Sequence, residues 1–179
     1  MVPLQIKGFF LDSEKMPIAV LCDDESRRVL PLWIGPSEAN SIIVRLEEIQ
    51  TPGPLTHDLL ASTFVRHGLR MDRLEIYRHE ESCGCAARIC YHRRFRRYAM
   101  EVRPSDGLAL AVRLQAPVVA SEELLASSNA SELMASLSDP SQGLFFLHAP
   151  GRSRTVAGAA PTSHSVPPAR PAPAEERFG

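Results

Sequence analysis

Apolar residues recur along the chain with two different periods, and these periods predict its secondary structure. Short apolar runs between polar turns predict strands, at residues 4–11, 16–22, 29–34, 69–77, 85–91, 97–102 and 117–119. Apolar residues at helical spacing predict helices that begin near Pro36, Thr56, Pro104 and Ser121. The pattern therefore predicts one folded domain of strands and helices over residues 1–127.

The first two predicted helices have boundary signals of their own. Gly35 and Pro36 end a strand and begin a helix whose apolar positions continue to Ile49. Thr56 is the predicted N-cap of the next helix, and Gly68 is its predicted C-terminal end. The inward face of this second helix is expected to carry three apolar side chains, Leu59, Leu60 and Phe64.

One stretch of the sequence occurs twice. Residues 34–46 align without a gap on residues 102–114, and Glu38 falls on Asp106. A second, shorter echo relates residues 56–62 to residues 121–127. The repeats predict an α+β fold built from a duplicated β-β-β-α-α unit with pseudo-two-fold symmetry and a mixed or antiparallel sheet. Chance similarity of two helices is the alternative, because proline and an acid are common at helix starts.

The composition changes in the last quarter of the chain. Seven of the 15 prolines lie from Pro140 onward, and such a segment buries too little surface to offset its ordering entropy. Residues 149–179 are therefore predicted to form a disordered Pro/Ala-rich tail, and residues 128–148 are ambiguous, with a short helix as one option. The apolar residues 144–147 are either part of a linker or a segment that docks on the domain.

Overall composition excludes a strong global field and a membrane-spanning protein. The chain has 179 residues, a net charge of −1 and 44% hydrophobic residues, which suffices for one domain with a core. No apolar run approaches the roughly 18 residues needed to span a bilayer, and the start does not resemble a signal peptide. A cytoplasmic protein with no membrane partner is expected.

The cysteines are expected to be free thiols in a reducing compartment. Cys83, Cys85 and Cys90 lie close together in the sequence but lack a fourth nearby thiol. A zinc site would therefore need His79 or His92 as its fourth ligand.

Positive charge is concentrated between residues 88 and 103, where six arginines oppose Glu101 alone. Arginines and aromatic residues alternate there around a predicted hairpin tip, a pattern typical of proteins that bind single-stranded nucleic acid. The candidate binding residues are Tyr91, Arg93, Arg94, Phe95, Arg96 and Arg97. A solvated hairpin whose arginines protect an edge strand is the alternative.

Polar residues also gather in the first turns of three predicted helices: Glu38, His57, Asp58, Arg103, Ser105 and Asp106. Hydrolysis of a phosphodiester needs a base and positive groups that stabilise the developing charge. His57 is the candidate base, Arg103 the candidate phosphate clamp and Ser105 an additional hydroxyl.

The three carboxylates of this group are candidate ligands of a divalent cation such as magnesium, namely Glu38, Asp58 and Asp106. The alternative is purely structural, because acids and hydroxyls in first turns are common helix caps. In that case Arg103 would pair with Asp58 or Asp106.

Four blocks of the sequence resemble the signature blocks of the bifunctional nuclease domain family. They are Leu30-Pro31-Leu32-Trp33-Ile34-Gly35, Glu38-Ala39, residues 54–59 and residues 103–111. The resemblance covers roughly residues 1–125 and implies an α+β domain and, as in the best-known plant members, cleavage of both RNA and DNA. Two positions depart from the family pattern, since Gly53 replaces an arginine and Gly107 replaces an alanine.

Residues and resemblance together predict a nuclease of low sequence specificity that hydrolyses phosphodiester bonds in RNA and/or DNA. A divalent cation is the expected cofactor, and no organic cofactor is expected. The alternative is a non-catalytic regulatory module of the same fold that binds protein or nucleic acid. The sequence leaves a homo-oligomer open.

Overall fold

A computed structural model gives the structure of the chain, and it describes residues 1–25, 27–79, 84–127 and 144–147. The first half contains β1 (Val2–Leu11), β2 (Pro17–Cys22), β3 (Val29–Trp33), α1 (Pro36–Leu46) and α2 (Thr56–Arg66). The second half contains β4 (Arg70–Arg78), β5 (Cys85–Arg93), β6 (Arg96–Val102), α3 (Pro104–Leu114), β7 (Val118–Ala120), α4 (Glu122–Ser127) and β8 (Leu144–Leu147).

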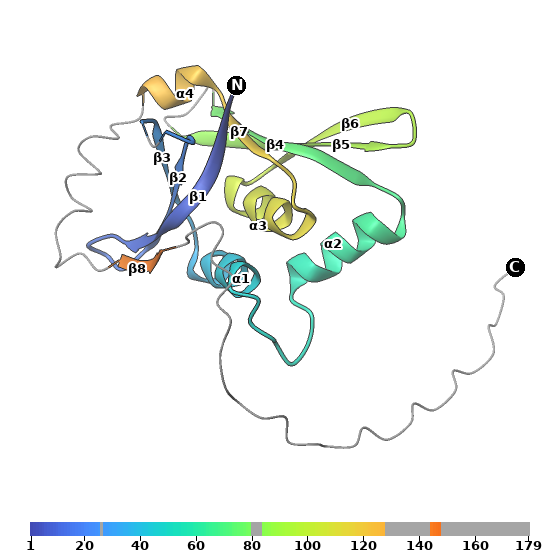
Figure 1. Cartoon of the computed structure of the whole chain (residues 1–179), viewed down its shortest axis with the longest axis horizontal. Helices are drawn as coiled ribbons and strands as arrows, with labels where there is room; N and C mark the ends of the chain where they lie inside the picture. The colour runs from blue at the N-terminus through green and yellow to red at the C-terminus, as the bar shows by residue number, and fades with distance from the viewer. Residues whose placement is uncertain (26, 80–83, 128–143, 148–179) are drawn as a thin grey trace, which may run out of the picture.

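The strands form one mixed sheet in the order β3-β2-β1-β7-β4-β5-β6, and β8 pairs with β1. Strand β7 runs parallel to β4 and antiparallel to β1, whereas the other pairs are antiparallel. Helices α1, α2 and α3 lie together on one side of this sheet (Figure 1). The predicted α+β class and mixed sheet are therefore confirmed.

The two halves resemble each other in part. Each begins with a three-stranded antiparallel meander followed by an 11-residue helix, and α1 and α3 begin at the two prolines that the sequence echo aligns. Helix α2 has 11 residues but α4 has 6, and β7 has no counterpart among the described elements of the first half. The duplicated, pseudo-symmetric unit stays a prediction.

Helix α3 lies at the centre of the core. Its residues 107–111 are buried, and it packs against α1, α2, β4 and β5. Gly107 permits this close approach, since a Cβ at this position would overlap Leu74 Cδ1 and lie 3.1 Å from Val102 Cγ2. The departure from the alanine of the family pattern thus has a local packing reason.

Three details of the predicted helices are wrong. Helix α1 ends at Leu46 and leaves Ile49 exposed, because Glu48 adopts a left-handed conformation with φ 52°. Leu59 and Leu60 are also exposed, because only a narrow face of α2, which includes Phe64, contacts the core. Leu55 rather than Thr56 is the N-cap of α2.

The C-terminal end of α2 follows the prediction. Gly68 comes directly after the C-cap residue His67 and has a φ of +65°, a conformation that glycine adopts without steric cost. The chain can therefore turn there from α2 into β4.

Strand β8 gives part of the C-terminal region a defined place. Its backbone pairs antiparallel with residues 8–10 of β1, so residues 144–147 dock on the domain as one alternative proposed. The other predictions for this region are a short helix within residues 128–148 and a disordered tail over residues 149–179; apart from residues 144–147, these segments lie outside the described residues. No helix of the described part is long and apolar enough to cross a membrane.

Candidate functional site

The N-terminal turns of α1, α2 and α3 surround one cleft of about 450 Å³, the helix-start cleft. Its lining residues are Ser37, Glu38, Asn40, Ser41, Leu55, Thr56, His57, Arg103 and Asp106. The three helices meet here because α1 and α2 both pack against α3, and α1 and α3 each begin directly after an outer strand of the sheet. Helix N-termini carry partial positive charge, so their convergence favours anions.

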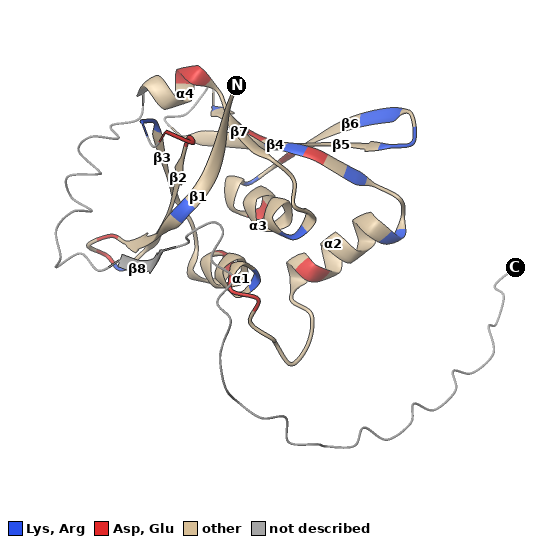
Figure 2. Ribbon diagram, viewed as in Figure 1, with Lys and Arg blue, Asp and Glu red and all other residues tan. Residues whose placement is uncertain are grey.

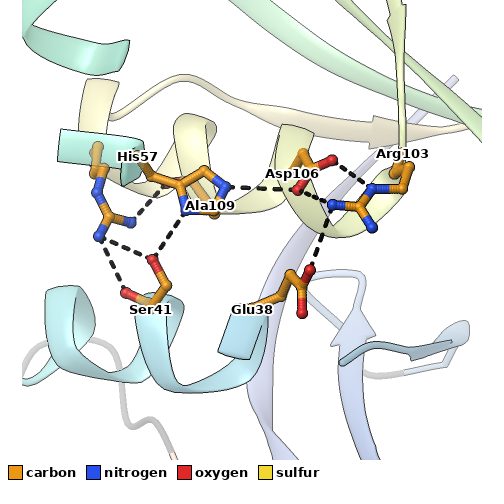
Figure 3. A network of polar contacts seen from close by, with 7 residues as sticks. Glu38, Ser41, His57, Arg103, Asp106 and Ala109 are labelled. Atoms are coloured by element: carbon orange, nitrogen blue, oxygen red, sulfur yellow. Dashed lines mark hydrogen bonds and ion pairs between the residues drawn. The ribbon is translucent and has the colours of Figure 1, made fainter. Parts of the chain in front are cut away.

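Arg103 joins the two carboxylates that line the helix-start cleft. Its Nε and Nη2 donate to Asp106 Oδ2 at 2.6 Å and to Oδ1 at 3.0 Å, and Nη2 also donates to Glu38 Oε1 at 3.4 Å (Figure 3). The hydrogen bond to Asp106 raises the pKa of Arg103. The arginine side chain is 70% exposed, so its outer nitrogens remain accessible from solvent.

His57, in the first turn of α2, contacts Asp106 and Ser41. Its Nε2 lies 3.6 Å from Asp106 Oδ1, and its Nδ1 lies 3.1 Å from the hydroxyl of Ser41 on α1 (Figure 3). The structure therefore brings Glu38, His57, Arg103 and Asp106 into one shared cleft. Ser105 lies in the first turn of α3 but is not among the residues that line the cleft.

The sequence interpretation missed Arg113, which donates hydrogen bonds to Ser41, one of the residues that line the cleft. This arginine is buried at the end of α3, with 3% of its side chain exposed. Its Nη1 donates to Ala109 O at 3.0 Å, and its Nη2 donates to Ser41 Oγ at 3.1 Å and to Ser41 O at 3.3 Å. An arginine in the otherwise apolar stretch 107–114 was the signal that could have identified it.

Asp58 pairs with the buried Arg113 and does not line the helix-start cleft. It accepts hydrogen bonds from Arg113 Nε at 2.6 Å and from the Leu55 N–H at 2.8 Å, and it lines a separate, smaller cleft with Arg113. Partial burial raises the pKa of Asp58, but these hydrogen bonds outweigh it, and the pKa lies below its ordinary value of 3.8. Of the two pairings considered for Arg103, the one with Asp106 forms and the one with Asp58 does not.

The three candidate metal ligands therefore do not form one set. Asp58 is bound to Arg113, while Glu38 and Asp106 share the guanidinium of Arg103. Across the part of the chain that the structure describes, no group of three or more His, Cys, Asp or Glu residues is placed to hold a metal ion. As arranged, these residues do not fit a divalent cation, and Arg103 supplies the positive charge instead.

The arginine-rich hairpin of β5 and β6 extends well past α3, and basic residues gather at its tip (Figure 2). Tyr91 packs between Tyr98, with ring centroids 5.3 Å apart, and Phe64 of α2 at 5.5 Å. Phe95 at the tip is fully exposed. Of the two candidate aromatic residues, Phe95 is free to stack on a base, whereas Tyr91 is engaged within the protein.

Three of the four cysteines can be placed, and all three are free thiols: Cys22, Cys85 and Cys90. Burial raises the pKa of each of them, which disfavours the reactive thiolate. Cys83 lies outside the described residues. The structure thus shows no activated thiol among the three cysteines that it describes.

Comparison with known proteins identifies the class to which this domain belongs. The model of the bifunctional nuclease domain family matches residues 19–132, a range that contains α1, α2, α3 and every residue lining the helix-start cleft. The chain belongs to the bifunctional nuclease domain family.

Two similar proteins come from strains of Mycobacterium tuberculosis. They are named uncharacterized protein MT1877 and uncharacterized protein Rv1829, and each is 31% identical to this chain over 115 residues. The aligned region covers 64% of this chain and 68% of each relative. Their names add no activity to the one that the family description carries.

Proposed function

We propose that the protein is a nuclease of low sequence specificity that hydrolyses phosphodiester bonds in RNA and/or DNA at the helix-start cleft. The observation that carries this proposal is that His57 and Arg103 both lie at Asp106 within one solvent-accessible cleft at three helix N-termini. Membership in the bifunctional nuclease domain family supports the same reaction class.

Three residues of the cleft have a role in the proposed reaction: His57, Arg103 and Asp106. His57 is the general base or acid, because an imidazole held by its hydrogen bond to Ser41 can exchange a proton with a reacting oxygen. Asp106, 3.6 Å from Nε2, orients the ring. Arg103 binds a phosphate oxygen, since a guanidinium that grips a carboxylate with two nitrogens can grip a phosphate in the same way.

The charges of the cleft set a condition on substrate entry. Glu38 and Asp106 oppose Arg103, so these fixed side-chain charges sum to −1. A phosphate that enters therefore competes with Glu38 and Asp106 for the exposed guanidinium of Arg103. Measuring cleavage with magnesium and with EDTA tests whether a divalent cation also takes part.

We further propose that the basic β5–β6 hairpin binds the nucleic-acid substrate. The fixed charge of the cleft is −1, so the cleft alone attracts a polyanion poorly, and the cationic hairpin tip supplies the missing positive charge. Charge contacts supply most non-specific affinity for nucleic acids. The alternative function, a non-catalytic module that binds protein or nucleic acid, is favoured by the ion pairs that neutralise Arg103 at rest.

A matched pair of histidine variants tests the proposal. His57→Ala removes the imidazole from the cleft, whereas His67→Ala removes an exposed imidazole from the other end of α2. We expect wild type and His67→Ala to cleave labelled RNA or DNA, and His57→Ala to lose this activity. Binding without cleavage by the wild type would instead support the regulatory module.

Three other predictions from the sequence remain proposals: the duplicated unit, the cytoplasmic location and a homo-oligomer. The duplicated unit is supported by the matching starts of α1 and α3. The cytoplasmic location is supported by three free thiols. A homo-oligomer stays a prediction.

A further inference from the structure

The β5–β6 hairpin presents different side chains on its two faces. Its register pairs Tyr91 with Tyr98 and Arg93 with Arg96, and in between pairs His92 with Arg97. Side chains alternate between the faces of a strand, and Tyr91 contacts Phe64 of α2. Arg93 and Arg96 therefore share the face toward the helices, whereas His92 and Arg97 point to the opposite face of the sheet.

That opposite face is hollowed near the tip by a cavity of about 830 Å³, the hairpin cavity. Three arginines line it, namely Arg73, Arg94 and Arg97, against one acid, Asp72. Its fixed side-chain charge is thus +2, opposite in sign to that of the helix-start cleft. Its volume lies within the range of about 300–1,000 Å³ typical of small-ligand pockets.

Two of these arginines are available to a ligand. Arg73 is held by Glu75 at 2.5 Å, and His92 Nδ1 lies 2.6 Å from Asp72 Oδ1. Arg94 and Arg97, by contrast, have no ion-pair partner among the residues that the structure describes. They are free cations at the rim of a concave, polar surface.

The backbone at Arg94 points to a role for its side chain. The turn between β5 and β6 consists of Arg94 and Phe95, and Arg94 has a φ of 53°. Glycine or asparagine relaxes such a left-handed position in a two-residue hairpin turn, whereas arginine is strained there. Strain of this kind is often retained where a side chain serves a function.

We propose that the hairpin cavity binds single-stranded nucleic acid, with Arg94 and Arg97 on backbone phosphates and Phe95 stacked on a base. The inference deepens the proposed function and rests on its nucleic-acid substrate. An exposed aromatic ring beside free arginines is suited to unpaired bases, because any base offers a face for stacking. A duplex would keep its bases away from Phe95.

The geometry also sets a length for the bound strand. The cavity and the helix-start cleft lie on opposite faces of the sheet, so the strand passes the open edge at β6, the last strand of the sheet. Arg97 and Arg103 are separated by six residues of extended chain, roughly 20 Å at about 3.3 Å per residue. At about 3.4 Å per stacked nucleotide, roughly six nucleotides connect the two sites.

Two double variants with the same loss of charge test the assignment. Binding of fluorescein-labelled 12-nucleotide oligo(dT) and oligo(U) to the full chain is measured by fluorescence anisotropy in EDTA. Arg94→Ser with Arg97→Ser is expected to weaken binding at least 10-fold and to lower the salt slope by about 1.4. Arg93→Ser with Arg96→Ser, on the face toward the helices, is expected to weaken binding at least 3-fold less than the first variant does. Equal losses in the two variants, or no binding by the wild type, would overturn the proposal.

Arg94→Gly separates the binding role from the folding of the hairpin. Since glycine relaxes the turn, we expect an unchanged or higher Tm together with weaker oligonucleotide binding. Wild-type affinity in this variant would refute the role of Arg94.

Failure of this site is distinguishable from failure of the proposed nuclease. If the wild type binds the oligonucleotide through Arg94 and Arg97 but does not cleave it, the binding site in the hairpin cavity stands and the nuclease proposal is wrong. If wild type and the Arg94→Ser, Arg97→Ser variant cleave the 12-nucleotide substrate equally, the nuclease proposal stands and the role of the hairpin cavity is wrong.

Discussion

Replacement of Arg113 by methionine tests the buried support of the cleft. The guanidinium donates to Asp58 Oδ1, Ala109 O, Ser41 O and Ser41 Oγ, and so connects α3 with α1 and α2. Methionine fills much of the same volume but donates no hydrogen bond. Arg45→Met is the matched control, because Arg45 is the exposed arginine at the same position of the first sequence echo.

The expected loss of stability follows from the burial of the two charged partners. Breaking a fully buried ion pair by removing one partner costs about 3–5 kcal/mol. Arg113 has 3% of its side chain exposed, but Asp58 has 34% exposed, so water can solvate the remaining carboxylate in part. We therefore expect Arg113→Met to lower the free energy of unfolding by about 3 kcal/mol, near the lower end of that range.

Urea unfolding followed by circular dichroism measures this change. Arg113→Met should shift the urea midpoint downward with an unchanged m-value, whereas Arg45→Met should alter the free energy of unfolding by less than about 0.5 kcal/mol. If the two variants are equally stable, the ion pair with Asp58 does not hold the three helices together. A normal stability of Arg113→Met would refute the reasoning from burial.

Three further predictions concern pH, packing and the family pattern. The pKa values of Asp58 and Glu75 are lowered in the folded protein, where hydrogen bonds from arginines outweigh the effect of burial. Protonation of these carboxylates therefore favours unfolding, and stability should fall as the pH drops below about 4. Asp58→Asn should reduce this pH dependence in urea titrations. Gly107→Ala should cost about 1–3 kcal/mol, because the added Cβ overlaps Leu74, and thermal melting would show no shift if α3 could move away. Gly53→Arg restores the arginine of the family pattern and should cost little stability, since no described atom lies within 4 Å of an added Cβ. It should strengthen oligonucleotide binding, and unchanged affinity in anisotropy assays would exclude a phosphate contact at this position.

Local signals in the sequence sufficed for most elements of the fold. Gly35-Pro36 and Arg103-Pro104 correctly predicted the starts of α1 and α3, because proline fixes the backbone at the first helical position. The charged first turns suggested that His57, Arg103 and Asp106 lie together, and Asp106 lies 3.6 Å from His57 and 2.6 Å from Arg103. Their catalytic roles remain a proposal.

Other features depended on tertiary contacts that periodicity does not encode. Leu59 and Leu60 have the spacing of core residues but remain exposed, since the apolar pattern does not tell whether a neighbour covers a helix face. Asp58 could have paired with Arg103 by sequence alone, yet the packing of α2 on α3 places it at Arg113. Only the assembled helices determine which of several arginines meets which acid.

The central claim is that the cluster around Asp106 performs chemistry and does not merely join helices. Cleavage rate and Tm, measured on the same preparation of Asp106→Asn, test this claim most directly, with wild type and His67→Ala as references. Since acid–base catalysis contributes about 10²–10⁴-fold, we expect cleavage to fall at least ~100-fold while Tm changes by less than ~2 °C, as for a partly exposed position. Retained cleavage together with a markedly lower Tm would contradict it and show that Asp106 is structural.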